Sequence, residues 1–236
     1  MIGTGTLVNA AAVVVGASAG LVIGKGLPER FRQTINYALG LITFFLAVRM
    51  IAAIERGYAL HVVGAVLAGA IIGELLKLEQ GLEWLGGRLR ERFAASRADD
   101  AATFVEGFVV ASMIFCIGPM TLLGTFEDGL GRTPLLLYIK SAMDGVLAIA
   151  LAATLGRGVL WSALVVLVFQ GALTLAALAG ASQIPELYVR GIESTGGVLI
   201  LAIGLLLLEV RRIRVANLLP ALPLVCLFLW LWPKGL

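Results

Sequence analysis

Long apolar segments, separated by short polar connections, cover most of the chain. Crossing a bilayer takes roughly 20 predominantly apolar residues. The pattern therefore predicts an all-α, polytopic transmembrane helical bundle of about eight spans. The spans are placed at 3–24, 34–54, 58–76, 103–125, 134–155, 158–182, 191–209 and 214–232. The second and seventh spans are the weakest, because Arg49 interrupts the second and Glu193 lies in the first turn of the seventh.

Composition agrees with a membrane protein. The 236 residues are 60% hydrophobic and 14% charged, whereas soluble domains average roughly 45–50% apolar and about 25% charged. The net charge of +3 does not indicate a nucleic-acid partner, because the basic residues lie at the ends of apolar segments. With both termini outside, two thirds of the 18 Lys and Arg residues fall on the inner side, as the positive-inside rule requires. The inner residues are Lys25, Arg30, Arg32, Lys77, Arg88, Arg90, Arg92, Arg97, Arg157, Arg211, Arg212 and Arg214.

Two similar motifs predict an internal repeat. Leu27-Pro28-Glu29 and Ile184-Pro185-Glu186 lie 157 residues apart, and each precedes an apolar span. Spans 1–3 would then correspond to spans 6–8. Equivalent spans are five spans apart, which is an odd number, so the two units should have opposite orientations in the membrane. Such inverted repeats are a recurring plan of secondary transporters. The alternative is coincidence, since Pro is common at helix starts. The predicted parts are 1–76 (first unit), 77–101, 102–156 (central two-span insert) and 157–236 (second, inverted unit).

The polar segment 77–101 predicts a cytoplasmic amphipathic helix followed by a hinge. Leucines and Phe93 recur at three- and four-residue steps over 78–93, and the opposite face is charged. Such a pattern is typical of a helix lying on the membrane surface. Ser96-Arg97-Ala98-Asp99-Asp100 then forms the hinge.

The central insert carries the most informative polar residues. Lys140 and Asp144 are four residues apart on the fifth span, so they lie on one helix face near mid-bilayer. Charges at that depth are costly and are usually paired, hydrated or functional. The pair could bind an ion or a proton, or it could be a structural ion pair facing the bundle. Ser141 beside it permits close helix approach and access of water.

The fourth span contains a predicted helix break at Gly118-Pro119. Pro119 has no N–H, so the carbonyl of Phe115 loses its helical partner, and freed carbonyls can coordinate a cation. Thr121 adds a hydroxyl, and Glu106 lies one turn inside the same span. The alternative is a packing kink with Glu106 in the interfacial region. Glu127-Asp128-Gly129 at the outer end of this span predicts a solvated turn, with acidic residues that draw cations as the alternative.

Other polar and small residues at membrane depth have weaker signals. Interhelical hydrogen bonding is the usual role of amides there, although Asn36 and Glu193 occupy equivalent repeat positions. Glu74 and Lys77 predict an i,i+3 ion pair. Glycine ridges at 16–24 and 69–73 predict close helix packing inside the chain, with a homodimer through these faces as the alternative. The remaining candidate lining residues are Asn9, Gln170 and Asn217.

No motif predicts an enzyme. His61 is the only histidine, the two cysteines lie in apolar segments, and no Cys/His cluster has metal-ligand spacing. The sequence contains no P-loop and no nucleophile–base arrangement. We therefore predict no catalytic residues, no metal site and no cofactor.

Several runs of residues are distinctive enough to indicate a family. The most specific are FCIGPM within FVEGFVVASMIFCIGPMTLLG at 104–124 and IRVANLLPAL at 213–222. With them, the chain resembles the YdfK/YqgA-like family of bacterial inner-membrane proteins, a domain-of-unknown-function group. The resemblance implies a multi-pass protein of the bacterial cytoplasmic membrane and brings no established substrate or catalytic residue. The other matching stretches are GTLVNA at 5–10, GELLKLE at 73–79, EDG at 127–129, KSAMDG at 140–145, FQGALT at 169–174 and STGGVLILAIG at 194–204.

These observations favour a small secondary transporter or channel-like protein that moves an ion or small polar solute through a midplane site. Asp144, Lys140 and Glu106, with the backbone around Gly118-Pro119, are the predicted site. The alternative is a structural or regulatory membrane protein that acts through oligomer or partner contacts. A membrane-embedded enzyme ranks below both.

Overall fold

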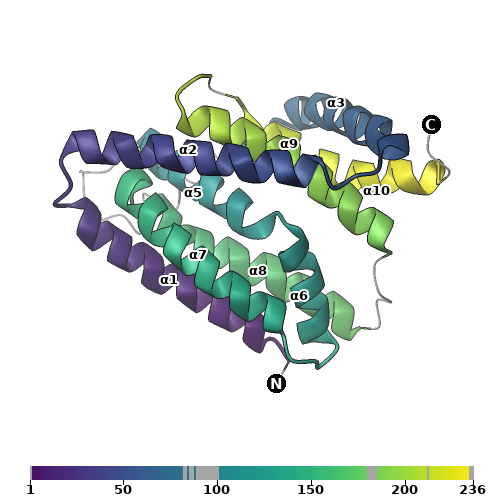
Figure 1. The fold of residues 1–236 in the computed structure, drawn as a ribbon, viewed down its shortest axis with the longest axis horizontal. Helices are drawn as coiled ribbons and strands as arrows, with labels where there is room; N and C mark the ends of the chain where they lie inside the picture. Colours follow the sequence, from purple (N-terminus) through teal and green to yellow (C-terminus); the bar gives the residue numbers. More distant parts are fainter. Residues whose placement is uncertain are drawn as a thin grey trace. The chain divides into compact units, whose positions relative to one another are not determined.

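The computed structural model describes residues 2–81, 84, 88, 101–179, 185–211 and 213–233, and all regular structure within them is helical. This confirms the predicted all-α architecture (Figure 1). The helices are α1 (Thr4–Gly24), α2 (Glu29–Ile51), α3 (Ala59–Leu76), α5 (Ala101–Cys116), α6 (Pro119–Gly129), α7 (Leu135–Leu155), α8 (Gly158–Leu178), α9 (Glu186–Leu207) and α10 (Ala221–Leu231), with 3-10 turns η1 (Arg56–Tyr58) and η2 (Val215–Leu218).

Among the described residues, six helices are long and apolar enough to cross a membrane, and α5 with α6 adds a seventh if the bent pair is one span. The axes of that pair differ by 64°, so the predicted break at Gly118-Pro119 is present. The eight-span count is not confirmed. The eighth candidate is a shorter apolar helix over Val215–Leu231, which divides into η2 and α10 because Pro220 lies between them.

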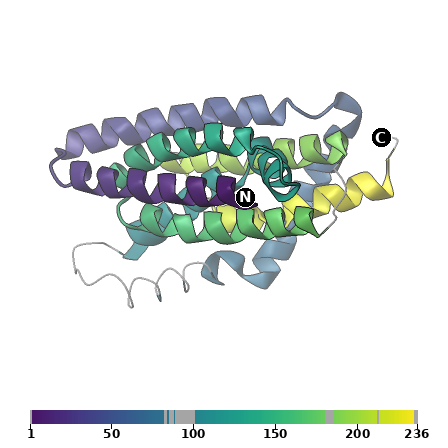
Figure 2. The same cartoon turned by 90° about the horizontal axis from the view of Figure 1, so that it is seen from below.

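The helices form two compact units, of which the first comprises residues 1–36 and 84–183. It contains α1, α5, α6, α7 and α8. The short connection between α7 and α8 makes these helices antiparallel neighbours. In Figure 2, α1 runs along both α7 and α8, and it contacts both.

Small residues allow α1 and α7 to pack backbone against backbone. Gly16, Gly20 and Gly24 of α1 lie against the carbonyl groups of Gly145, Ile149 and Ala153 of α7. The residue numbers rise together on both helices, so α1 and α7 are parallel. The ridge at 16–24 is therefore used within the chain, as the sequence favoured, and a homodimer remains an untested alternative.

A buried carboxylate caps the first helix. Asp128, near the end of α6, accepts hydrogen bonds from the backbone N–H groups of Gly3 (3.0 Å), Gly5 (3.0 Å) and Thr6 (3.3 Å). These N–H groups have no partners within a helix, and a negative charge there is favoured by the helix dipole. The residue is 1% exposed. The predicted solvated turn at 127–129 is therefore wrong, because its central carboxylate is held inside the unit.

We expect Asp128→Ala to lower the free energy of unfolding by about 2–3 kcal/mol, since it leaves three backbone donors unpaired. Thermal unfolding of the purified protein in detergent measures the loss. Glu127→Ala is the neighbouring control, because no hydrogen bond joins its buried Oε2 atom to the described residues. Equal stability of the two variants would contradict a capping role for Asp128.

The second unit comprises residues 37–83 and 184–236 and contains the C-terminal part of α2 with α3, α9 and α10. Its α2–α9 contact has an internal symmetry. A Cβ on Gly40 would lie 3.2 Å from the backbone nitrogen of Leu208, and a Cβ on Gly197 would lie 2.8 Å from that of Ile51. Both Gly40 to Gly197 and Ile51 to Leu208 are steps of 157 residues. The repeat itself remains a prediction, and this reciprocal contact is what an inverted repeat requires.

A polar cluster joins the end of α3 to η2 in this unit. Glu74 accepts hydrogen bonds from Arg214 (2.7 Å) and from the Asn217 amide (2.7 Å), and the Asn217 oxygen accepts from the backbone N–H of Glu79 (2.8 Å). The predicted Glu74–Lys77 ion pair is therefore replaced by the Glu74–Arg214 pair. Lys77 ends α3 in a left-handed conformation with φ 53°, so the chain turns away there. The predicted amphipathic helix over 78–93 and the hinge at 96–100 lie largely outside the described residues.

Candidate functional site

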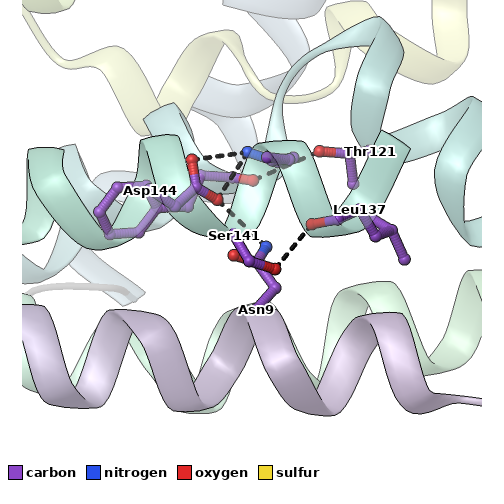
Figure 3. A network of polar contacts seen from close by, with 7 residues as sticks. Asn9, Thr121, Leu137, Ser141 and Asp144 are labelled. Carbon is purple, nitrogen blue, oxygen red and sulfur yellow. Dashed lines mark hydrogen bonds and ion pairs between the residues drawn. The ribbon is translucent and has the colours of Figure 1, made fainter. Parts of the chain in front are cut away.

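The Lys140–Asp144 pair lies inside the first unit. The Lys140 ammonium donates hydrogen bonds to both carboxylate oxygens of Asp144, at 2.8 and 2.7 Å (Figure 3). The two side chains are only 10% and 7% exposed. Their spacing of four residues on α7 places both on one helix face, and that face points into the unit. Burial makes each charge depend on the other, because an unpaired charge there would be uncompensated.

A neighbouring helix supplies a third member. Asn9 of α1 donates from its amide nitrogen to Asp144 Oδ2 at 3.1 Å and is fully buried. The carboxylate only accepts, which fixes the amide orientation and turns the Asn9 oxygen away from it. That oxygen has no hydrogen-bond partner among the described residues. A buried amide oxygen left in this state is an acceptor available to a cation or a polar solute.

The broken helix lies beside the pair (Figure 3). Because Pro119 cannot donate, the Phe115 carbonyl receives, from the described residues, only a long contact of 3.4 Å from the Thr121 hydroxyl. Cys116, the last residue of α5, is close enough to Lys140 and Asp144 for their charges to act on it. The C-terminal end of α5, which carries partial negative charge, therefore lies near the ion pair.

Local hydrogen bonds occupy the hydroxyls of Ser141, beside the pair, and of Thr125, one turn after Thr121 on α6. Ser141 donates to the carbonyl of Leu137 at 2.6 Å, and Thr125 donates to that of Thr121 at 2.7 Å. Both hydroxyls are thereby satisfied on their own helices, as Ser and Thr are in membrane helices. Ser141 thus lies near Asp144 but donates its hydrogen bond to a carbonyl of its own helix. The Thr121 hydroxyl instead faces the helix break at Gly118-Pro119.

Helix α8 contributes a second unsatisfied amide. Gln170 is fully buried, and neither its nitrogen nor its oxygen has a partner among the described residues. Thr174, one turn later, contacts Thr6 of α1 at 3.3 Å. Helices α1 and α8 are antiparallel, because α1 is parallel to α7 and α7 is antiparallel to α8. One turn back from Thr174 along α8 and one turn forward from Thr6 along α1 therefore bring Gln170 level with Asn9.

Other predicted site residues are not brought to this point. Glu106 is partly buried on α5, but nine residues separate it from Phe115, which is about 13 Å along the helix. Asn36 of α2 has a buried amide oxygen without a partner in the described part of the chain. Glu193 and Asn217 belong to the second unit, where Asn217 is part of the cluster with Glu74.

Sequence reasoning did not include Ser112 among the lining residues. It lies one turn before Cys116 on α5, and its buried hydroxyl lacks a partner among the described residues. The sequence signal that could have found Ser112 is its position four residues before Cys116, which places both side chains on one face of α5. No group of three or more His, Cys, Asp or Glu residues suited to a metal ion occurs in the residues that the structure describes.

Comparison with known proteins assigns the chain to a family. The profile of the family "Protein of unknown function (DUF554)" matches residues 4–230, and this range includes every residue of the site. The chain belongs to the DUF554 family. The predicted resemblance is confirmed by two relatives. YdfK of Bacillus subtilis (strain 168), an uncharacterized membrane protein, is 28% identical over 220 residues, and YqgA of Escherichia coli (strain K12), an uncharacterized protein, is 29% identical over 219 residues.

Each relative of this DUF554 chain is matched over 92% of its length and over 92% of the chain. The similarity therefore covers the bundle and not only one motif. No solved structure matches this chain. The relatives and the apolar helices establish a membrane protein of this family.

Proposed function

We propose that this DUF554 protein is a small secondary transporter or channel-like protein that moves an ion or a small polar solute through a site at Asp144 and Lys140. The observation that carries the proposal is the buried ion pair beside a broken membrane helix. Charged residues at this depth usually mark a transport path or a relay. Broken helices present backbone groups to substrates in many secondary transporters.

The arrangement supports transport better than a purely structural pair. A structural pair is stable when its remaining donors and acceptors are satisfied, whereas buried amide atoms of Asn9 and Gln170 lack partners among the described residues. Groups of different kinds surround Asp144, so the site can exchange partners. The reciprocal contact at Gly40 and Gly197 supports an inverted repeat, the plan on which many transporters alternate their access.

The second candidate is a structural or regulatory membrane protein. The glycine ridges give this candidate little support, because they are already in contact within the chain. Gly16 and Gly20 are covered by α7, and Gly69 and Gly73 lie against Ala221 and Asn217. Partner contacts would have to use other surfaces. We propose no enzymatic activity, since the described residues around the site form no nucleophile–base–orienter arrangement.

Reconstituted proteoliposomes test transport. The purified protein would be assayed for uptake of radiolabelled sodium, rubidium, chloride and an amino-acid mixture, with a pH dye inside the vesicles. We expect uptake of at least one species, and an initial rate lower by about tenfold or more for Asp144→Asn, because the charge at the site is lost. Glu186→Gln is the matched control, because Glu186 also forms an i,i+4 ion pair, with Arg190 at 2.6 Å, but at an exposed position.

The control should transport at the wild-type rate. Initial rates are compared per mole of folded, monodisperse protein in the vesicles, because Asp144→Asn is also expected to lower the stability. Uptake that is unchanged in a folded Asp144→Asn protein would show that the pair is structural. A wild-type protein that moves no member of the panel would refute the transport proposal.

A further inference from the structure

The charges around Asp144 define the kind of ion that fits. Among the described residues, the oxygens of Asp144 meet Lys140 and Asn9, and the other polar groups of the site are amides, hydroxyls, a carbonyl and the Cys116 thiol. One carboxylate among neutral oxygens balances a single positive charge. Divalent cations are commonly held by several carboxylates or by substrate phosphates, and no such cluster occurs in the described part of the chain.

The available donors are hard oxygen atoms. The Asn9 amide oxygen is buried without a partner among the described residues, and the Phe115 carbonyl has only its 3.4 Å contact with Thr121. Gln170 adds a buried amide oxygen on α8 in the same state. Carbonyls at the C-terminal end of a broken helix are known ligands of alkali cations, and the negative end of the α5 dipole favours positive charge there.

The carboxylate of Asp144 is occupied by the ammonium of Lys140. This ammonium donates to both oxygens of Asp144, at 2.7 and 2.8 Å, so a second cation cannot reach the carboxylate while that ammonium remains. We propose that a monovalent inorganic cation competes with Lys140 for Asp144 and that the displaced Lys140 gives up a proton. This inference rests on the proposed function and names the substrate class of the same site.

The exchange balances in charge and atoms. Before binding, the site holds Lys140–NH3⁺ and Asp144–COO⁻. Afterwards it holds Lys140–NH2, Asp144–COO⁻ and the cation, and one H⁺ has left for water. The proton leaves because an ammonium beside a bound cation would be buried and uncompensated, which is the least favourable state for a charge in an interior. One cation enters for one proton released, so the step is electroneutral.

Binding to the detergent-purified full chain tests the inference without transport. NaCl, LiCl and KCl are titrated against choline chloride at constant ionic strength, with thermal stability and a pH dye in weak buffer as readouts. We expect at least one alkali cation to raise the unfolding temperature saturably and to release about one proton per chain. Its apparent Kd should fall about tenfold for each unit rise in pH, because the proton is a competing ligand.

Two substitutions at Lys140 separate the exchange from general folding effects. Lys140→Arg keeps a cation for Asp144 but cannot lose its proton, so we expect a folded protein with a cation response weaker by about tenfold or more and no proton release. Lys140→Met leaves the buried carboxylate without a counter-ion, so Asp144 holds a proton before the cation arrives. The cation should then bind with release of that proton, which would show that Asp144 is its ligand. Glu186→Gln should behave as the wild type.

The results distinguish this inference from the proposed function. If no alkali cation acts differently from choline, or if Lys140→Arg responds as the wild type does, the cation exchange is refuted even where the proteoliposomes take up another solute. If the cation binds with proton release but no species enters proteoliposomes, the exchange stands as a binding reaction and the transport proposal falls.

Discussion

Replacing Asp144 by Asn while keeping Lys140 is expected to destabilise the protein by about 3–5 kcal/mol, because it leaves a buried ammonium without its counter-ion. The side chain of Lys140 is only 10% exposed, so the ammonium cannot gain hydration without leaving its place. Asn9 also loses the carboxylate to which it donates at 3.1 Å. The amide that replaces this carboxylate can accept a hydrogen bond but carries no charge.

A double-variant comparison shows whether the loss comes from the pair. Lys140→Met combined with Asp144→Leu removes both charges and fills the space with apolar side chains, and such replacements of buried pairs are often neutral or stabilising. We expect the double variant to recover most of the stability lost by Asp144→Asn, while it transports nothing. Thermal unfolding in detergent and initial uptake rates give the two readouts. Additive losses from the two positions would contradict a coupled buried pair.

Gly20→Ile is the second substitution with a large expected effect. A Cβ at Gly20 would meet the carbonyl group of Ile149 and would lie 3.0 Å from the Cβ of Ala152. The obstacle is backbone, which cannot move aside as a side chain does, so α1 would have to separate from α7. We expect a loss of about 3 kcal/mol, the upper part of the usual range for overpacking, with a lower unfolding temperature.

Ser18→Ile is the matched control, since Ser18 lies on the exposed face of the same helix. It adds the same side chain toward the surroundings and should leave the unfolding temperature within about 2 °C, as surface substitutions usually do. The separation in Gly20→Ile would also move Asn9 away from Asp144, because both contacts belong to the α1–α7 packing. Equal unfolding temperatures for the two variants would show that α1 and α7 do not approach this closely.

These substitutions report on different properties of one site. In the proposed site, the charge pair would determine which ligand binds, and the glycine contact would determine whether Asn9 reaches that ligand. A transporter needs both, whereas a structural ion pair needs only that its charges remain matched. Loss of transport in a double variant that is stable would therefore favour function over scaffolding.

The sequence by itself determined those features that depend on neighbours along the chain. Apolar segment length predicted a helical membrane protein, because a spanning helix must satisfy its backbone internally. The spacing of Lys140 and Asp144 placed them on one helix face, and Pro119 predicted the break between α5 and α6 since it lacks an N–H. The two Pro-Glu motifs indicated helix starts, and helices do begin at Glu29 and Glu186.

Only the tertiary structure decided which distant groups meet. Asn9 reaches Asp144 from 135 residues away, and Asp128 caps α1 across a similar separation, because α1 packs in parallel along α7. No local pattern distinguishes Asn9 from Asn36, or Asp128 from a residue in a solvated turn. Helix periodicity predicts which residues share a face, whereas the packing of the glycine ridges determines which helix that face contacts. Glu106 was predicted to line the inner path of the same site, and α5 keeps it about 13 Å from Phe115. Asn9 contacts the pair that the sequence had already singled out, and Gln170 lies level with Asn9 on α8.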